Sequence, residues 1–299
     1  MKKIDVNGQL VACAEEVEAA LAAYMNNEDQ DLKEIFDAQG YSLLGGGKRI
    51  RPYLVMAFCK TLGGAKEKAL PLACALEMIH TYSLIHDDLP CMDDDEYRRG
   101  RLTNHKVFGE AVAVLAGDAL LTKAFEVVSA SNDLSSEEKV EAIKILSTAA
   151  GDRGMIGGQV MDMAAEACDA ALDLSYLTRM HGRKTGALIK AAAMLGCLSA
   201  GKSKEDAVVT AASGYAEKIG LAFQVVDDVL DVTSDVATLG KNVGVDGAQN
   251  KLTFMRFYSV EQAEAYAKTL TKEAVKVISP FDKEGELEAL AEYLLSRKH

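Results

Sequence analysis

Proline is scarce in this chain, and its placement restricts the class of fold. Four prolines occur in 299 residues, at positions 52, 71, 90 and 280. The stretch from Cys91 to Ser279 therefore lacks the residue that most strongly breaks a helix. Tryptophan is absent and aromatic residues make up only 6%, so few runs compete for strand structure. The sequence predicts an all-α protein with long helices.

Helical periodicity supports this prediction. Ile219, Phe223, Val226 and Leu230 form an apolar stripe at spacings of four, three and four residues. Many long helices with glycine-containing connections favour one large helical bundle with sites between facing helices. No composition shift, linker or repeat divides the sequence, so a single domain is expected over residues 1–299. The expected helices cover residues 71–88, 109–131, 136–163, 173–200, 204–231, 259–278 and 284–297.

The acidic balance of charge narrows the range of partners. Lys and Arg total 33 against 45 Asp and Glu, which gives a formal net charge of -12. Binding to nucleic acid or to anionic lipid needs a basic patch, so neither is expected. An anionic substrate needs either local basic clusters or cations that it brings with it.

The compartment is inferred from the apolar runs and the cysteines. No apolar run is long enough for a membrane span, and no signal-peptide core follows the basic start. Six cysteines without a CxxC pair fit small buried thiols in a reducing compartment better than a disulfide framework. We expect a cytoplasmic protein with no stable membrane anchor.

Two aspartate clusters are the strongest chemical feature. The first lies in HDDLPCMDDD, residues 86–95, and the second is DDVLD, residues 227–231. Asp227 and Asp231 are one helical turn apart and repel each other unless a cation lies between them. Carboxylates alone are hard ligands suited to Mg²⁺, which completes its shell with water and phosphate oxygens. Either run alone could be a solvated helix end, and an EF-hand calcium loop fits neither. Two clusters in one helical chain favour a metal site.

A basic segment, GGGKRIRP at residues 45–52, places a glycine turn before three cations. It is not a Walker P-loop, because Ser42 stands where the first glycine belongs and Arg49 follows the lysine. Taken alone it is also compatible with a surface turn. Flexible backbone beside Lys48 and Arg51 nevertheless suits a phosphate group.

Together these motifs form an ordered set that resembles the trans-isoprenyl diphosphate synthases, and within them the short-chain bacterial farnesyl diphosphate synthases. One departure occurs near the end of the set, where Phe254-Met255 follows Lys251-Leu252-Thr253 in place of the usual Tyr-Pro. That change is confined to a late loop. The matching segments are GGGKRIRP (45–52), EMIHTYSLIHDDLPCMDDDEYRRG (77–100), GGQVMD (157–162), HGRKTGAL (181–188), FQVVDDVLD (223–231) and GKNVGVDGAQNKLTF (240–254).

The resemblance implies the isoprenoid synthase fold, an all-α bundle around a deep central cavity, assembled as a homodimer. It also implies several Mg²⁺ ions bridging the two Asp clusters and the substrate diphosphate. The implied metal ligands are Asp87, Asp93 and Asp227, supported by Asp88 and Asp231.

The same resemblance implies two sites for isoprenoid diphosphates and a chain-length determinant. Lys184, Thr185, Gln224 and Lys241 are implied in catalysis and, with Arg98, in binding the allylic diphosphate. Lys48, Arg51, His80 and Arg99 are implied in binding isopentenyl diphosphate. Tyr82 and Ser83, five and four residues before the first aspartate, are implied to limit product length.

The implied reaction joins isopentenyl diphosphate to dimethylallyl or geranyl diphosphate by Mg-assisted allylic ionisation, and Tyr82 favours farnesyl diphosphate as the main product. Geranyl or geranylgeranyl diphosphate synthesis by the same family remains an alternative. A terpene cyclase or squalene-type synthase lacks a separate isopentenyl diphosphate pocket, so GGGKRIRP, His80 and Arg99 argue against it. A non-catalytic subunit of a heteromeric synthase is expected to lose an Asp cluster, and both are complete here.

Overall fold

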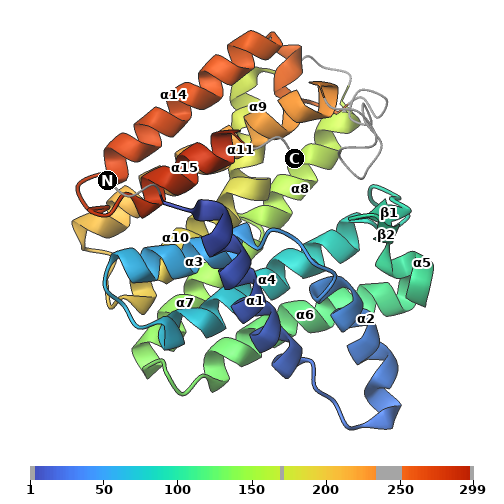
Figure 1. The fold of residues 1–299 in the computed structure, drawn as a ribbon. Coiled ribbons are helices and arrows are strands. Elements are labelled where there is room, and N and C mark those ends of the chain that lie inside the picture. The colour runs from blue at the N-terminus through green and yellow to red at the C-terminus, as the bar shows by residue number, and fades with distance from the viewer. Residues whose placement is uncertain (1–3, 169–171, 234–250, 297–299) are drawn as a thin grey trace.

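Long helices run through the described part of the computed structural model, which comprises residues 4–168, 172–233 and 251–296 (Figure 1). Strands occur there only as a two-stranded hairpin, so the all-α prediction is confirmed. The helices are α1 (Val6–Tyr24), α2 (Lys33–Leu43), α3 (Ile50–Thr61), α4 (Lys66–Asp87), α5 (Asn104–Phe108), α6 (Glu110–Ala130), α7 (Ser136–Ala150), α8 (Met155–Glu166), α9 (Leu174–His181), α10 (Ala187–Ser199), α11 (Ala207–Thr233), α14 (Val260–Ile278) and α15 (Glu286–Ser296). Three short elements join them, the 3-10 turns η1 (Gln30–Leu32) and η3 (Phe254–Arg256) and the π-helical turn η2 (Gly182–Gly186). In the described residues no helix has both the length and the apolar character needed to cross a membrane.

Helix α4 forms the centre of the bundle. It packs against α3, α6 and α10, and its buried residues lie on every side of the helix, as expected for a helix inside a core. Small side chains allow close helix packing here. At Gly196 of α10, for example, a Cβ atom would lie 2.6 Å from the carbonyl oxygen of Val55 in α3. Helices α11 and α14 pack along each other on the C-terminal side (Figure 1).

Two of the predicted long helices are interrupted. The segment 136–163 was expected to be one helix, but it forms α7 and α8 with a glycine-rich turn between them. A Cβ at Gly154 would lie 2.1 Å from the carbonyl oxygen of Ala149, so the turn is too tight for a side chain there. The segment 173–200 contains the π-helical turn η2 between α9 and α10. Periodicity alone does not detect either interruption.

Other differences concern the ends of helices and elements that were not predicted. Helix α4 begins at Lys66 and continues through Pro71, where the predicted helix begins. Helices α6, α11, α14 and α15 match their predicted ranges to within three residues at each end. The expected set omits α1, α2, α3 and α5, and it omits the hairpin of β1 (Tyr97–Arg98) and β2 (Arg101–Leu102).

The hairpin turn consists of Arg99 and Gly100, both with positive φ, at 53° and 73°. Two successive residues of this kind are typical of the tight turns that join antiparallel strands. A non-glycine residue at the first position is uncommon. The turn presents Arg99 beside the loop that precedes α3, where its guanidinium donates to the carbonyl oxygen of Gly46.

Arg49 anchors the glycine-rich loop that precedes α3. Its side chain is fully buried and its φ is 48°, in the left-handed region. The guanidinium donates to Glu77 of α4 at 2.6 Å, to Glu18 of α1 at 3.1 Å and to the carbonyl oxygen of Leu43 at 2.7 Å. One arginine therefore joins three helices and the loop between α2 and α3.

We predict that Glu77→Gln lowers the free energy of unfolding by about 3 kcal/mol, because removing one partner leaves a buried charge poorly compensated. Glu18 limits the loss because it keeps its contact with Arg49. Denaturant-induced unfolding measures this loss. The matched control is Glu16→Gln, which breaks the exposed pair with Lys66 and is expected to cost less than about 1 kcal/mol. Equal losses in the two variants would contradict the anchoring role of Arg49.

Candidate active site

The first acidic cluster lies where α4 ends. Asp87 is the last residue of the helix, and the chain then folds back on itself. The backbone N–H of Asp93 donates to the carbonyl oxygen of Asp87 at 2.9 Å, and that of Asp94 donates to Leu89 at 3.1 Å. Asp94 takes a left-handed φ of 50°, which closes the loop. The fold of this loop brings Asp93 close enough to act electrostatically on Asp87.

The Asp87 carboxylate lies in an unfavourable environment for a negative charge. Burial raises the pKa of Asp87 to about 6, and the charge of Asp93 adds to the rise while Lys184 opposes it. The carboxyl end of a helix is itself the negative end of its dipole. A bound cation would offset the effects of burial, of Asp93 and of the helix dipole, because it favours the ionised carboxylates.

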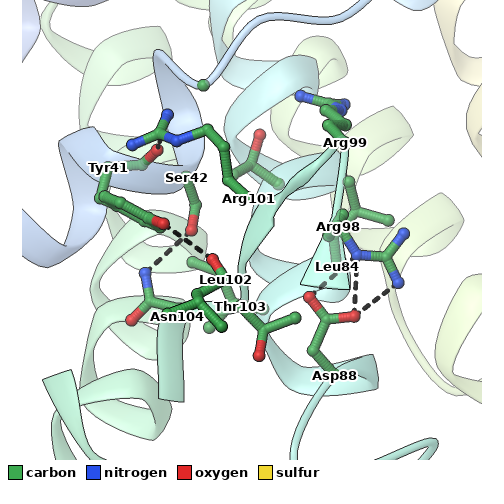
Figure 2. Close-up of a pocket in the computed structure, with 13 residues that line it drawn as sticks. Tyr41, Ser42, Leu84, Asp88, Arg98, Arg99, Arg101, Leu102, Thr103 and Asn104 are labelled. Carbon is green, nitrogen blue, oxygen red and sulfur yellow. Dashed lines mark hydrogen bonds and ion pairs between the residues drawn. The ribbon is translucent and has the colours of Figure 1, made fainter. Parts of the chain in front are cut away.

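Asp88 has a different role from Asp87. Its buried carboxylate accepts hydrogen bonds from Arg98 Nε at 2.8 and 2.9 Å and from Arg98 Nη2 at 2.5 Å. Figure 2 shows Arg98 turned onto Asp88, whereas Arg99, the next residue, points away from it. The pair ties the hairpin to the end of α4. Arg98 was predicted to bind the allylic diphosphate, and in this structure its guanidinium is engaged with Asp88.

The second acidic cluster lies on α11. Gln224 Nε2 donates to Asp227 Oδ2 at 3.2 Å, and Asp227 is near enough to Arg51 to act on its charge. Asp228 is buried and accepts a 2.7 Å hydrogen bond from the backbone N–H of Phe254. Asp231 is also buried. Asp228 thus fixes the start of η3 against α11, a role that the sequence did not reveal.

The segment that begins at Lys251 returns to the first acidic cluster. Lys251 Nζ lies 4.0 Å from Asp93 Oδ2. Phe254 is completely buried and stacks on His181, with ring centroids 5.5 Å apart and an interplanar angle of 17°. The unusual Phe254-Met255 pair therefore keeps an aromatic ring packed inside the fold. Lys251 was part of a matched motif but was not assigned a role from the sequence.

Lys184 faces the first cluster from the π-helical turn η2. Its Nζ donates to Asp162 Oδ2 of α8 at 2.6 Å. Burial alone would lower the pKa of Lys184, but Asp162 and Asp87 raise it above its ordinary value, so the ammonium group remains charged. A Cβ at Gly158 would lie 2.1 Å from the backbone nitrogen of Lys184, so glycine permits this contact between α8 and η2. The GGQVMD motif thus positions Lys184.

Arg51, His80 and Arg99 form a separate basic pocket. Arg51 Nη1 donates to His80 Nε2 at 3.3 Å, because an arginine has no acceptor atom. Burial and then the charges of Arg51 and Arg99 lower the pKa of His80 well below its ordinary value, so its ring is neutral. Arg99 donates to the carbonyl oxygen of Gly46.

Two features of the basic pocket suit an anion. The Nε atom of Arg51 is buried without a hydrogen-bond partner among the described residues. A Cβ at Gly47 would lie 2.8 Å from the Arg99 guanidinium, so the glycine loop approaches that cation closely. Lys48 is exposed on the same loop. The pocket therefore concentrates positive charge where an anionic ligand would be held.

A cavity of about 570 Å³, within the range of small-molecule sites, is lined by members of the first acidic cluster and of the basic pocket. Its lining residues do not include the predicted site residues Lys48, Asp93, Arg98, Arg99, Gln224 and Asp227. Its polar end contains Arg51, His80, Asp87, Lys184 and Thr185, all of which were predicted from the sequence. Tyr82 and Ser83, the predicted chain-length residues, also line it. Apolar side chains form most of the remaining wall, namely Leu89, Met92, Val114, Met155, Ile156, Val160 and Met163. Gln159 lines the cavity too and was not assigned from the sequence.

The donor set fits magnesium that arrives with a phosphate ligand. In the parts of the chain that the structure describes, no three acidic, histidine or cysteine side chains converge tightly enough to hold a metal ion by themselves. Mg²⁺ is commonly held by one or two carboxylates together with substrate phosphates and water. Asp87 and Asp93, at the end of α4 and in the loop after it, and Asp227 on α11 carry hard oxygen ligands of this kind. Lys241, predicted to be catalytic, lies outside the described residues.

Comparison with known proteins places these features in one family. The Polyprenyl synthetase family model matches residues 32–294. A dimethylallyltranstransferase of Fischerella ambigua is 44% identical over 95% of this chain and 82% of its own length. A geranylgeranyl diphosphate synthase of Cyanophora paradoxa is 45% identical over 89% of this chain and 88% of its own.

Solved structures agree in fold along nearly the whole chain. An FPP/GFPP synthase of Zymomonas mobilis superposes with a TM-score of 0.87 at 35% identity, covering 97% of this chain and 98% of that one. A geranyltransferase of Helicobacter pylori, solved with magnesium and isoprenyl diphosphate, gives a TM-score of 0.84 at 36% identity, covering 96% and 95%. With its acidic clusters, basic pocket and cavity in place, this chain belongs to the polyprenyl synthetase family of prenyltransferases, the trans-isoprenyl diphosphate synthases.

Proposed function

We propose that this prenyltransferase condenses isopentenyl diphosphate with dimethylallyl and then geranyl diphosphate, giving mainly farnesyl diphosphate. The observation that carries the proposal is a cavity lined by Asp87 of the acidic cluster, by Arg51 and His80 of the basic pocket, and by an apolar wall that includes Tyr82. A diphosphate at each polar group would leave both hydrocarbon parts inside the same chamber.

The allylic diphosphate would be held at the acidic clusters. Asp87, Asp93 and Asp227 would bind Mg²⁺ together with its oxygens, and the bound metal would supply Lewis-acid stabilisation of the leaving group. The charged ammonium of Lys184 stabilises negative charge on the departing diphosphate. The apolar walls exclude water, so the allylic cation meets the alkene of the second substrate rather than solvent.

Isopentenyl diphosphate would bind in the basic pocket. Lys48, Arg51, His80 and Arg99 hold its diphosphate without a metal, so this substrate is bound but not ionised. Neutral His80 accepts from Arg51 and fixes the direction of that guanidinium. Its alkene then attacks the allylic cation, which forms the new carbon–carbon bond and leaves a tertiary cation. A neighbouring carbon loses a proton to the departing diphosphate, and the electron pair of that C–H bond forms the new double bond.

Product length is proposed to depend on Tyr82. Five residues of helix place Tyr82 about 7.5 Å along the α4 axis from Asp87. Its ring is buried, and its hydroxyl has no hydrogen-bond partner among the described residues. Overpacking a filled site costs about 1–3 kcal/mol, so the ring resists a chain longer than fifteen carbons. Geranylgeranyl diphosphate is the alternative product, and relatives from Catharanthus roseus and Cyanophora paradoxa carry that synthase name.

A homodimer and a cytoplasmic location complete the proposal. Apolar side chains at the open side of the cavity, among them Val114, Ile156 and Val160, are 39 to 61% exposed and would be covered by a second copy of the chain. All six cysteines are free thiols, which agrees with a reducing compartment.

We predict that Asp87→Asn and Asp227→Asn each lower kcat by roughly 100-fold or more, because metal-assisted stabilisation of the leaving group amounts to several kcal/mol. Asp94→Asn is the matched control, since Asp94 is exposed in the same loop. EDTA is expected to abolish the activity of the wild type, and Mg²⁺ to restore it. Near-normal turnover in either cluster variant would show that the two clusters do not share one metal site.

The two diphosphate sites are expected to respond differently to substitution. Arg99→Ala or His80→Ala should raise KM for isopentenyl diphosphate roughly tenfold, as expected for loss of a charged hydrogen bond. Lys184→Ala should instead lower kcat. Arg101→Ala is the control, because this guanidinium lies 4.0 Å over the ring of Tyr41 (Figure 2) and neither residue lines the 570 Å³ cavity. Steady-state kinetics with each substrate varied in turn will decide, and the reverse pattern would exchange the two assignments.

Tyr82→Ala is expected to lengthen the product to geranylgeranyl diphosphate or beyond without changing the Mg²⁺ requirement, because it removes the ring from the cavity wall. Chromatography of the dephosphorylated products measures the distribution. Tyr82→Phe keeps the ring and removes only a hydroxyl that has no hydrogen-bond partner among the described residues, so it serves as the control. An unaltered distribution in Tyr82→Ala would remove Tyr82 as the limit on chain length.

A further inference from the structure

His86 lies one helical turn after Tyr82 on α4, and the two side chains are in contact. Their rings meet edge to face, with centroids 5.7 Å apart and an interplanar angle of 79°. Such aromatic pairs contribute beyond the area that they bury. Both residues line the cavity. His86 is therefore the neighbour that limits movement of the Tyr82 ring toward the acidic end.

The His86 ring is held in a recess of α6. A Cβ at Gly117 would lie 2.2 Å from His86 Nε2 and 2.5 Å from Cδ2, so the ring occupies space that only glycine leaves. Nε2 donates to the carbonyl oxygen of Val114 at 3.0 Å, since a carbonyl can only accept. The carboxylate of Asp118 lies 3.9 Å from the same nitrogen. Shape and a hydrogen bond together fix the ring against α6.

We propose that His86, seated against Gly117, is a positioning residue that sets product length by holding Tyr82 in the cavity wall. The inference rests on the proposed function only in that the cavity receives the growing hydrocarbon chain. Helix α6 closes one side of the His86 ring and Tyr82 another, so a ring pushed out of the recess moves into the cavity. A missing ring leaves Tyr82 without its neighbour and enlarges the cavity.

Two variants are therefore expected to act in opposite directions. Gly117→Ala forces the His86 ring into the cavity and shifts the products toward shorter chains. His86→Ala enlarges the cavity and shifts them toward longer chains. In each variant the ratio of longer to shorter products should change roughly tenfold relative to the wild type, since one methylene in an apolar pocket is worth at least that much discrimination. Gly40→Ala in α2, where a Cβ meets nothing within 4 Å, is the matched control.

The double variant His86→Ala/Gly117→Ala separates positioning from a general packing effect. With no imidazole to displace, Gly117→Ala should add no further change to the product ratio, so the two substitutions should be strongly non-additive. Thermal unfolding and KM for isopentenyl diphosphate are measured for every variant, because neither should follow the product ratio. The double variant and His86→Ala still test the proposal if Gly117→Ala does not fold.

The outcomes separate this inference from the proposed function. A wild type that makes mainly geranylgeranyl diphosphate would contradict the proposed product but leave the shifts in ratio to be observed. An unchanged product ratio in folded His86→Ala would overturn the inference. An effect of Gly117→Ala that is equally large without His86 would also overturn it, because the recess would then act through packing of α4 on α6.

Discussion

The charges around the active site are arranged about one buried carboxylate, that of Asp87 at the carboxyl end of α4. A carboxylate there is opposed by desolvation, by the helix dipole and by Asp93. The fold brings positive charge to it from distant segments, Lys184 from η2 and Arg98 from the hairpin. These two cations do not remove the rise in the pKa of Asp87. The site therefore remains suited to a further cation, and the glycine contacts and salt bridges around it maintain that state.

The basic pocket gathers positive charge at the same cavity, whereas the acidic cluster gathers negative charge. Two arginines are held close together, and the histidine between them stays neutral instead of adding a third positive charge. Arg49, although it lies in the same motif, is taken up by Glu77 and Glu18 and stabilises the loop instead of facing the cavity. Adjacent residues of one basic motif are thus divided between folding and binding. Under the proposed function, this division keeps a metal-free anion site beside a metal-dependent one.

Much of the fold class and the main site residues could be predicted from the sequence, because scarce proline, helical period and acidic motifs are local signals. The two interruptions in long helices could not, because they depend on close backbone contacts that periodicity does not show, a tight turn of Gly154 against Ala149 and the approach of Gly158 to Lys184. The pairing of Arg98 with Asp88 and the anchoring of η3 by Asp228 were missed for the same reason. A motif shows which residues are available, whereas packing determines which of them face the cavity.

Helix α4 carries His80 of the basic pocket, Tyr82 of the cavity wall and Asp87 of the acidic cluster on one continuous hydrogen-bonded rod. The spacing between these groups is fixed by the helical rise of about 1.5 Å per residue and does not depend on how loops open or close. Thermal motion of the surrounding loops can change how fast substrates enter and leave. The distance along α4 from Asp87 to Tyr82, which under the proposed function limits the hydrocarbon chain, therefore stays the same through the catalytic cycle.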